Sequence, residues 1–108
     1  MHWPDDADGD VLRRLQDAGF NFSREVEIDF NIDFEDWPPS HEFTEGLKLA
    51  CPGAKIVFEE DHIQLRLRAP VTYEYVVHMQ TDLTEIARPF GGWCESWGVL
   101  WDPKTHAN

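Results

Sequence analysis

Positive charge is scarce in this sequence. Nine lysines and arginines stand against 21 aspartates and glutamates, which leaves a formal net charge of −12 at pH 7. A field of that sign repels phosphate backbones, so we expect no direct binding to nucleic acid. The same field favours basic protein partners, although an equally simple interpretation is that the acidity keeps the protein in solution.

Long apolar runs and cysteine motifs are also missing. No run approaches the ~20 residues that a membrane-spanning helix needs, and the opening MHWPDDADGD has no apolar signal segment. Cys51 and Cys94 lie far apart without CxxC spacing. A disulfide between them is one alternative, but two cysteines in a chain without an export signal most often remain reduced. We therefore expect a cytoplasmic protein that does not contact a membrane.

Motifs that carry catalysis or hold cofactors are absent as well. None of the five histidines has HxH, HxxxH or HExxH spacing, and neither cysteine completes a familiar zinc motif. No glycine-rich segment forms a phosphate cradle, and no serine occupies a nucleophile elbow. Paired carboxylates could serve acid–base chemistry if desolvated, but here they recur on a predicted solvated face. We predict no enzyme, with no catalytic residue, cofactor or metal.

The stretch from Arg24 to Glu35 is the most regular in the chain. It alternates apolar and polar residues without a break. Since successive side chains of a strand point to opposite sides, this period of two predicts a half-buried β-strand. We expect it to be the central strand of a small sheet, with one apolar and one acidic face. The apolar residues are Val26, Ile28, Phe30, Ile32 and Phe34, and the acidic residues are Glu25, Glu27, Asp29, Asp33 and Glu35.

Other patterns predict the remaining elements. Apolar residues at helical spacing indicate helices over 10–18, 41–50 and 71–87, and alternating residues indicate strands over 54–59, 62–69 and 93–101. Ser40 and Thr72 are candidate caps of the second and third helices, as is one of Asp5, Asp6 and Asp8 for the first. Gly19 is suited to end the first helix. The tail from Pro103 is expected to fray.

This order of elements predicts one domain over residues 1–108, of the α+β class. A strand–helix–strand–strand–helix–strand series is typical of a ferredoxin-like two-layer sandwich: an antiparallel four-stranded sheet with helices on one face, here with an extra N-terminal helix. The first and third strands would be central neighbours, which places the carboxylates beside Arg66 and Arg68. Such cross-strand pairs stabilise a sheet by about 0.2–1 kcal/mol each, a structural use that competes with a functional one.

The segment GGWCESWGVLW contains three tryptophans, Trp93, Trp97 and Trp101. We expect most of them in the core, and any others in an apolar patch that faces a partner. Cys94 in the same segment has no base beside it, so we predict an unreactive thiol.

Three stretches together resemble the regulator of ribonuclease E activity B family (RraB-like proteins). They are DGDVLRRLQDAGFNFS, EIDFNIDFEDWP, and TYEYVVHMQTDLTEIARPFGGW with ESWGVL. The resemblance runs from about Asp8 to Leu100, and none of its motifs is catalytic. It implies a small cytosolic ferredoxin-like sandwich from a bacterial family of non-enzymatic regulators. It also implies binding to the non-catalytic scaffold of ribonuclease E, which carries basic RNA-binding segments, and a lowering of that enzyme's activity in RNA decay.

Our first functional hypothesis is therefore a protein-binding regulator. A basic segment of the partner, with ribonuclease E as the candidate, would meet the acidic strand face at Glu25, Glu27, Asp29, Asp33 and Glu35. The alternative is a small ligand-binding or enzymatic sandwich that uses a pocket between sheet and helices. A third hypothesis is assembly of the chain with itself through an edge strand. The oligomeric state is open at this point.

Overall fold

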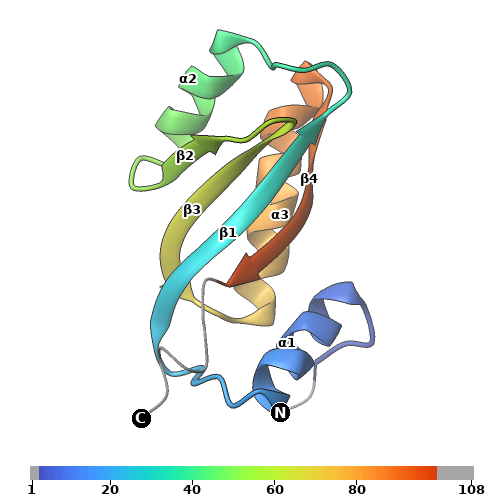
Figure 1. The fold of residues 1–108 in the computed structure, drawn as a ribbon, viewed down its shortest axis with the longest axis vertical. Coiled ribbons are helices and arrows are strands. Elements are labelled where there is room, and N and C mark those ends of the chain that lie inside the picture. Colours follow the sequence, from blue (N-terminus) through green and yellow to red (C-terminus); the bar gives the residue numbers. More distant parts are fainter. Residues whose placement is uncertain (1–2, 100–108) are drawn as a thin grey trace.

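The computed structural model describes residues 3–99, and its elements follow the predicted order (Figure 1). The end of the predicted strand over 93–101 and the tail from Pro103 lie outside the described residues. The elements are α1 (Ala7–Asp17), β1 (Glu25–Phe34), α2 (His41–Ala50), β2 (Lys55–Phe58), β3 (His62–Pro70), α3 (Tyr73–Ala87), the short 3-10 helix η1 (Arg88–Phe90) and β4 (Gly92–Val99).

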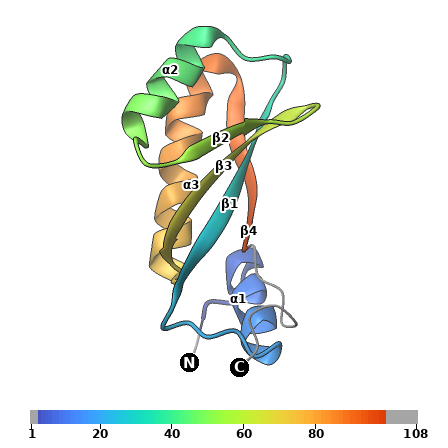
Figure 2. The ribbon, with the colours of Figure 1, turned by 60° about the vertical axis from the view of Figure 1, so that its left-hand side comes forward.

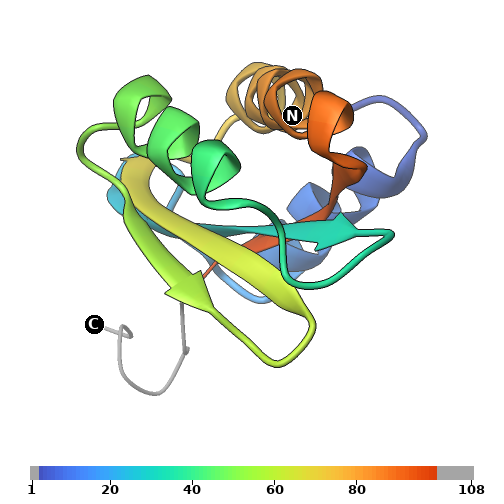
Figure 3. The same ribbon diagram turned by 90° about the horizontal axis from the view of Figure 1, so that it is seen from above.

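The strands form one antiparallel four-stranded sheet in the order β2-β3-β1-β4. Strand β1 therefore lies between β3 and β4, which confirms the predicted central strand. Helices α2 and α3 lie together on one side of this sheet (Figure 3). The predicted ferredoxin-like sandwich is confirmed, and the other side of the sheet, which we call the open face, is not covered by α2 or α3.

The core lies between the sheet and these two helices. Ile28, Phe30 and Ile32 of β1 are fully buried because their side of the strand points to the helices. Phe43 and Leu47 of α2 are equally inaccessible, whereas Ala50, the last residue of that helix, is exposed. Further fully buried side chains come from β3 and α3: Ile63, Leu65, Val76 and Leu83.

Side-chain caps set where the helices begin. The Asp6 carboxylate accepts a hydrogen bond from the backbone of Gly9, so α1 begins at Ala7, earlier than the predicted Asp10. Ser40 and Thr72 cap α2 and α3 as predicted. Because Thr72 is the cap, α3 begins at Tyr73 and not at Val71.

Helix α1 lies beyond one end of the sheet, apart from α2 (Figure 2). It contacts α3, and its Leu12 is fully buried in the common core. Gly19 follows the helix with a φ of 91°, the left-handed conformation that the sequence predicted for this glycine. Among residues 3–99, no helix combines the length and the apolarity needed to cross a bilayer.

Candidate functional site

The open face carries the predicted partner-binding carboxylates, which we call the acidic row. Four of them lie on β1, on the side opposite the core residues, and Glu35 directly follows the strand. Their accessibility differs along the row. Glu25, Glu27 and Glu35 are exposed, Asp33 is half-buried, and Asp29 retains only 7% of its accessible surface. The predicted solvated face is therefore correct at the ends of the row and wrong at Asp29.

Asp29 is buried in the middle of the sheet, beside the long side chain of Arg66. Its register partner on β3 is Arg66, whose Nε lies 3.4 Å from Asp29 Oδ1. That Nε donates instead to Gln64 Oε1 at 2.7 Å, so Asp29 Oδ1 accepts no hydrogen bond. Burial raises the pKa of Asp29, and the nearby Glu27 adds to this, while Arg66 opposes it.

Cations of β3 offset part of the acidic row. Asp29 pairs in register with Arg66, and Glu27 pairs with Arg68, as the topology predicted. Glu25, Glu27 and Glu35 nevertheless make no ion pair with any residue of the described part of the chain. Their charges thus remain available to a partner, whereas that of Asp29 is engaged within the sheet.

The other end of the row combines acids with an aromatic ring. Asp33 lies between His62 of β3 and Trp93 of β4. Trp93 is 37% exposed, and its indole Nε1 donates to Glu95 Oε2 at 2.6 Å. Burial and the nearby Glu95 raise the pKa of Asp33, and the His62 ring opposes this shift. Negative charge is therefore poorly compensated at this end of the open face.

A neutral hydrogen-bonded row separates the two ends of the open face. Gln64 Nε2 donates to Asn31 Oδ1 at 3.2 Å, and Asn31 Nδ2 donates to Ser96 Oγ at 3.1 Å. The row crosses β3, β1 and β4 at the point where the β1–β4 register shifts. Glu95 is left without a register partner at this bulge, so it projects beside Trp93.

The tryptophans of the last strand have different environments. Trp97 is buried, and its Nε1 donates to Asp8 Oδ1 of α1 at 2.8 Å. Trp93 is on the open face, and Trp101 lies outside the described residues. Cys94 has the unreactive environment predicted for it, because burial raises the pKa of its thiol to about 12.

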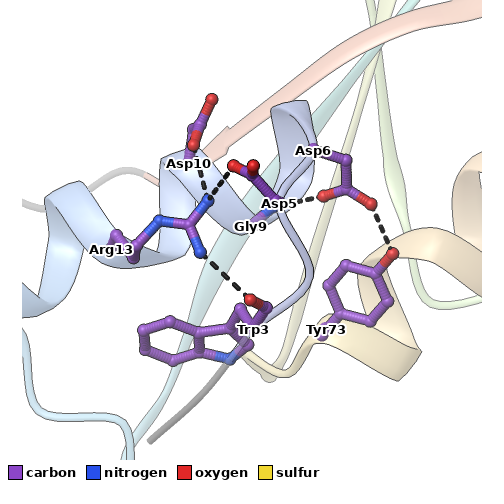
Figure 4. Close-up of polar contacts among 7 residues, drawn as sticks. All are labelled: Trp3, Asp5, Asp6, Gly9, Asp10, Arg13 and Tyr73. Carbon is purple, nitrogen blue, oxygen red and sulfur yellow. Dashed lines mark hydrogen bonds and ion pairs between the residues drawn. The ribbon is translucent and has the colours of Figure 1, made fainter.

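A polar network that sequence patterns did not predict joins α1 to α3 (Figure 4). Tyr73 of α3 donates its hydroxyl to Asp6 Oδ2 at 2.6 Å, and this bond lowers the pKa of Asp6 and raises that of Tyr73. Arg13 donates to Asp10 at 2.6 Å and to the Trp3 carbonyl at 3.1 Å. The acidic N-terminal residues had suggested a helix cap, but no local pattern could identify partners more than 60 positions away.

A shallow groove of about 290 Å³ lies between the end of α2 and the side of α3. Its two carboxylates, Asp82 and Glu85, lie within 3.0 Å of His78 Nε2 and Arg88 Nη1 respectively. Burial raises the pKa of the Cys51 thiol at the same groove, which makes it a poor nucleophile. Within residues 3–99, no group of three or more His, Cys, Asp and Glu side chains could hold a metal ion.

The family of this chain follows from its similarity to known proteins. The model of the RraB family, described as regulator of ribonuclease activity B, matches residues 5–99 of the 108-residue chain. The match begins just before α1 and ends with the last residue of β4, so it spans every described element. A search of curated proteins gave no match. The chain belongs to the RraB family of regulators of ribonuclease activity.

Proposed function

We propose that this protein is a non-enzymatic regulator that binds a ribonuclease through the acidic row of its open face. The partner's contact would be a basic segment, and the candidate partner is the non-catalytic scaffold of ribonuclease E. Binding there would lower the activity of that nuclease in RNA decay. Membership of the family of ribonuclease regulators supports the choice of partner class.

The observation that carries this proposal is a set of exposed carboxylates on a rigid strand. Glu25 and Glu27 project from β1, the strand held between two hydrogen-bonded neighbours. A partner cation can approach them without breaking any ion pair within residues 3–99. Complementary charge of this kind speeds encounter and orients the complex more than it adds affinity.

Within the acidic row, the residues would contribute unequally. Glu25, Glu27 and Glu35 offer accessible charge, and Asp33 adds charge next to the exposed ring of Trp93. Asp29 is buried and faces Arg66, so it would act mainly by holding that arginine in place. We therefore assign direct contact to the two ends of the row.

Isothermal titration calorimetry, in which the protein is titrated with the purified ribonuclease E scaffold, tests the proposal by the heat of binding. We expect saturable binding at low salt that weakens as salt screens the exposed charges. In parallel, the cleavage rate of the full-length nuclease should fall as the protein is added. Absence of binding at low salt would remove the proposal, and binding without any loss of cleavage would remove its regulatory part.

The alternative of a ligand-binding or enzymatic sandwich has little support from the groove between α2 and α3. Catalytic and ligand sites need polar groups that converge on one point. Here Asp82 and Glu85 are each engaged by a neighbour on the same helical segment, and the Cys51 thiol has a raised pKa. The groove therefore does not lead us to a second candidate function.

A further inference from the structure

A chain of aromatic rings leads from the core to the surface at one end of the sheet. The Phe34 ring, at the end of β1, lies 4.9 Å from the buried Phe43 ring and 6.2 Å from the Trp37 ring, measured between ring centroids. Trp37 lies in turn 6.4 Å from Phe58, the last residue of β2. Phe58 is 53% exposed and Trp37 is half-buried. These two rings, which we call the aromatic pair, therefore form part of the surface.

The two loops beside the aromatic pair contain carboxylates but no lysine or arginine. One loop follows β1 over residues 35–40, and the other is the β2–β3 turn over residues 59–61, at the same end of the sheet (Figure 2). Their acidic residues are all exposed: Glu35, Asp36, Glu59, Glu60 and Asp61. Asp61 lies 2.8 Å from His62 Nδ1, and the other four make no ion pair within residues 3–99. Uncompensated negative charge thus flanks the aromatic pair.

The indole N–H of Trp37 lacks a partner. The indoles of Trp93 and Trp97 donate to carboxylates, whereas Trp37 Nε1 makes no hydrogen bond to any residue between 3 and 99. It is open to solvent, because Asp29 Oδ1 is the sole buried and unpaired polar side-chain atom in that range. An accessible donor of this kind suits a backbone carbonyl, which every peptide segment carries.

We propose that the aromatic pair is a docking site for an arginine side chain of the partner's basic segment. The guanidinium stacks on the exposed Phe58 ring, and Trp37 Nε1 donates to a backbone carbonyl of the same segment. A guanidinium is planar and carries its N–H groups around its edge, so it can stack on a ring and still donate to the flanking carboxylates. A lysine ammonium is a compact, strongly hydrated charge and cannot make both contacts in this way.

This inference rests on the proposed function for the identity of the partner, and it adds the residue that the partner presents. The two sites are continuous, because Glu35 ends the acidic row and is followed directly by Asp36 and Trp37. One extended segment can therefore contact the acidic row and then the aromatic pair. The carboxylates of the acidic row attract arginine and lysine alike, so the aromatic pair is the part of the surface that selects arginine.

Two dye-labelled peptides of equal length and charge test this selection, one of alternating arginine and glycine and one of alternating lysine and glycine. Fluorescence anisotropy at about 0.02 M salt, where surface charges are weakly screened, measures the binding of each. We expect the arginine peptide to bind about threefold more tightly, the usual effect of a cation stacked on an exposed ring. Equal affinity for the two peptides, or no binding of either, would overturn the proposal.

Variants of Phe58 assign the preference to the aromatic pair. Phe58→Leu keeps an apolar side chain but removes the ring, so it should bind both peptides equally. Phe58→Tyr keeps the ring and should retain the preference for arginine. Leu49→Ala is the control at another exposed apolar residue, on α2, and should change nothing. A preference for arginine that persists in Phe58→Leu would overturn the proposal, once circular dichroism shows that all variants are folded.

The flanking carboxylates are tested in the same assay. Glu59→Gln with Glu60→Gln should weaken the binding of both peptides. Asp17→Asn with Glu74→Gln makes the same change in net charge at exposed positions of α1 and α3 and should weaken binding much less. Equal weakening by the two double variants would show that net charge governs binding, and would count against a site at this end of the sheet.

Titration with the ribonuclease E scaffold separates this inference from the proposed function. We expect Phe58→Leu to bind the scaffold more weakly than Phe58→Tyr does. If the scaffold binds Phe58→Leu as tightly as the unmodified protein, the arginine site is wrong and the proposed function stands. If the scaffold binds no variant while the preference for the arginine peptide still depends on Phe58, the proposed partner is wrong and the arginine site stands.

Discussion

At the scale of single residues, Gly91 and Gly92 at the start of β4 have different roles. Gly91 has a φ of 76° and provides the turn, whereas Gly92 provides space. A Cβ atom on Gly92 would lie 2.5 Å from the Phe34 ring and 2.9 Å from the Asp33 carbonyl oxygen. The glycine thus lets β4 approach β1 at the end of the acidic row. The sequence indicated a strand start here, but not the reason for two glycines.

Gly92→Ala should lower the free energy of unfolding by about 1–3 kcal/mol, because overpacking forces Phe34 or the backbone to shift. Chemical denaturation, followed by circular dichroism, measures the change. Gly98→Ala is the matched control on the same strand, since a Cβ there meets nothing within 4 Å. We expect Gly98→Ala to be neutral or slightly stabilising. Equal losses in both variants would contradict the packing explanation.

At the scale of elements, α1 depends on contacts that cross the whole chain. Asp8 Oδ1 accepts hydrogen bonds from Trp97 Nε1 at 2.8 Å and from Gln80 Nε2 at 2.9 Å. One carboxylate therefore joins α1 to both α3 and β4. The predicted helix began only at Asp10, so Asp8 was one of three candidate caps, and its role as an anchor was not predicted.

Asp8→Ala should lower the free energy of unfolding by about 1.5–3 kcal/mol, the usual value of a hydrogen bond to a charged group. The melting temperature should fall by roughly 6–20 °C for a domain of this size, and amide exchange should become faster in α1. Asp17→Ala is the control, because Asp17 is exposed at the negative end of the α1 dipole. Unchanged exchange in α1 after Asp8→Ala would show that other contacts hold the helix.

The edge strands bear on the hypothesis of assembly through a sheet edge. Strand β2 has four residues, and β4 is bulged at Glu95. The backbone N–H of Cys94 donates to Thr84 Oγ1 of α3, so this donor is not available to pair with another strand. Short strands, bulges and edge charges all hinder edge pairing. These features of β2 and β4 therefore disfavour assembly through a sheet edge.

At the scale of the whole molecule, the excess of acid determines how partners approach. In the proposed complex, the net charge of −12 would attract a basic segment from a distance, and the exposed members of the acidic row would determine where that segment contacts the sheet. Long-range attraction and local contact can be separated experimentally, because the first depends on the net charge of the protein and the second on the positions of the charged side chains.

Glu25→Lys with Glu27→Lys should slow association with the ribonuclease E scaffold about tenfold at low salt, because charges at the contact steer encounter. Stopped-flow or surface-based kinetics over a salt series measures the rate. The Asp17→Lys, Glu42→Lys variant has the same net charge and should slow association much less. If both variants slow it equally, net charge alone governs encounter, and the acidic row is not the contact.

The sequence alone determined the elements of the fold and their order. Strict alternation from Val26 to Phe34 predicted β1, and Ser40 and Thr72 marked two helix starts. These features depend on neighbours a few positions apart, which are visible in one dimension. The order of the elements indicated a ferredoxin-like topology, and that topology predicted that carboxylates of β1 would lie beside Arg66 and Arg68.

Only the tertiary structure decided what each side chain of the open face can do. Asp29 is buried beside Arg66 of the neighbouring strand β3. Exposure of Trp93 but not of Trp97 depends on the bulge in β4 and on Asp8 of α1. The register pairs of Glu27 with Arg68 and of Asp29 with Arg66 likewise depend on which strands are adjacent. Accessibility and charge compensation come from residues distant in the chain, and the alternating pattern of a single strand contains no information about them.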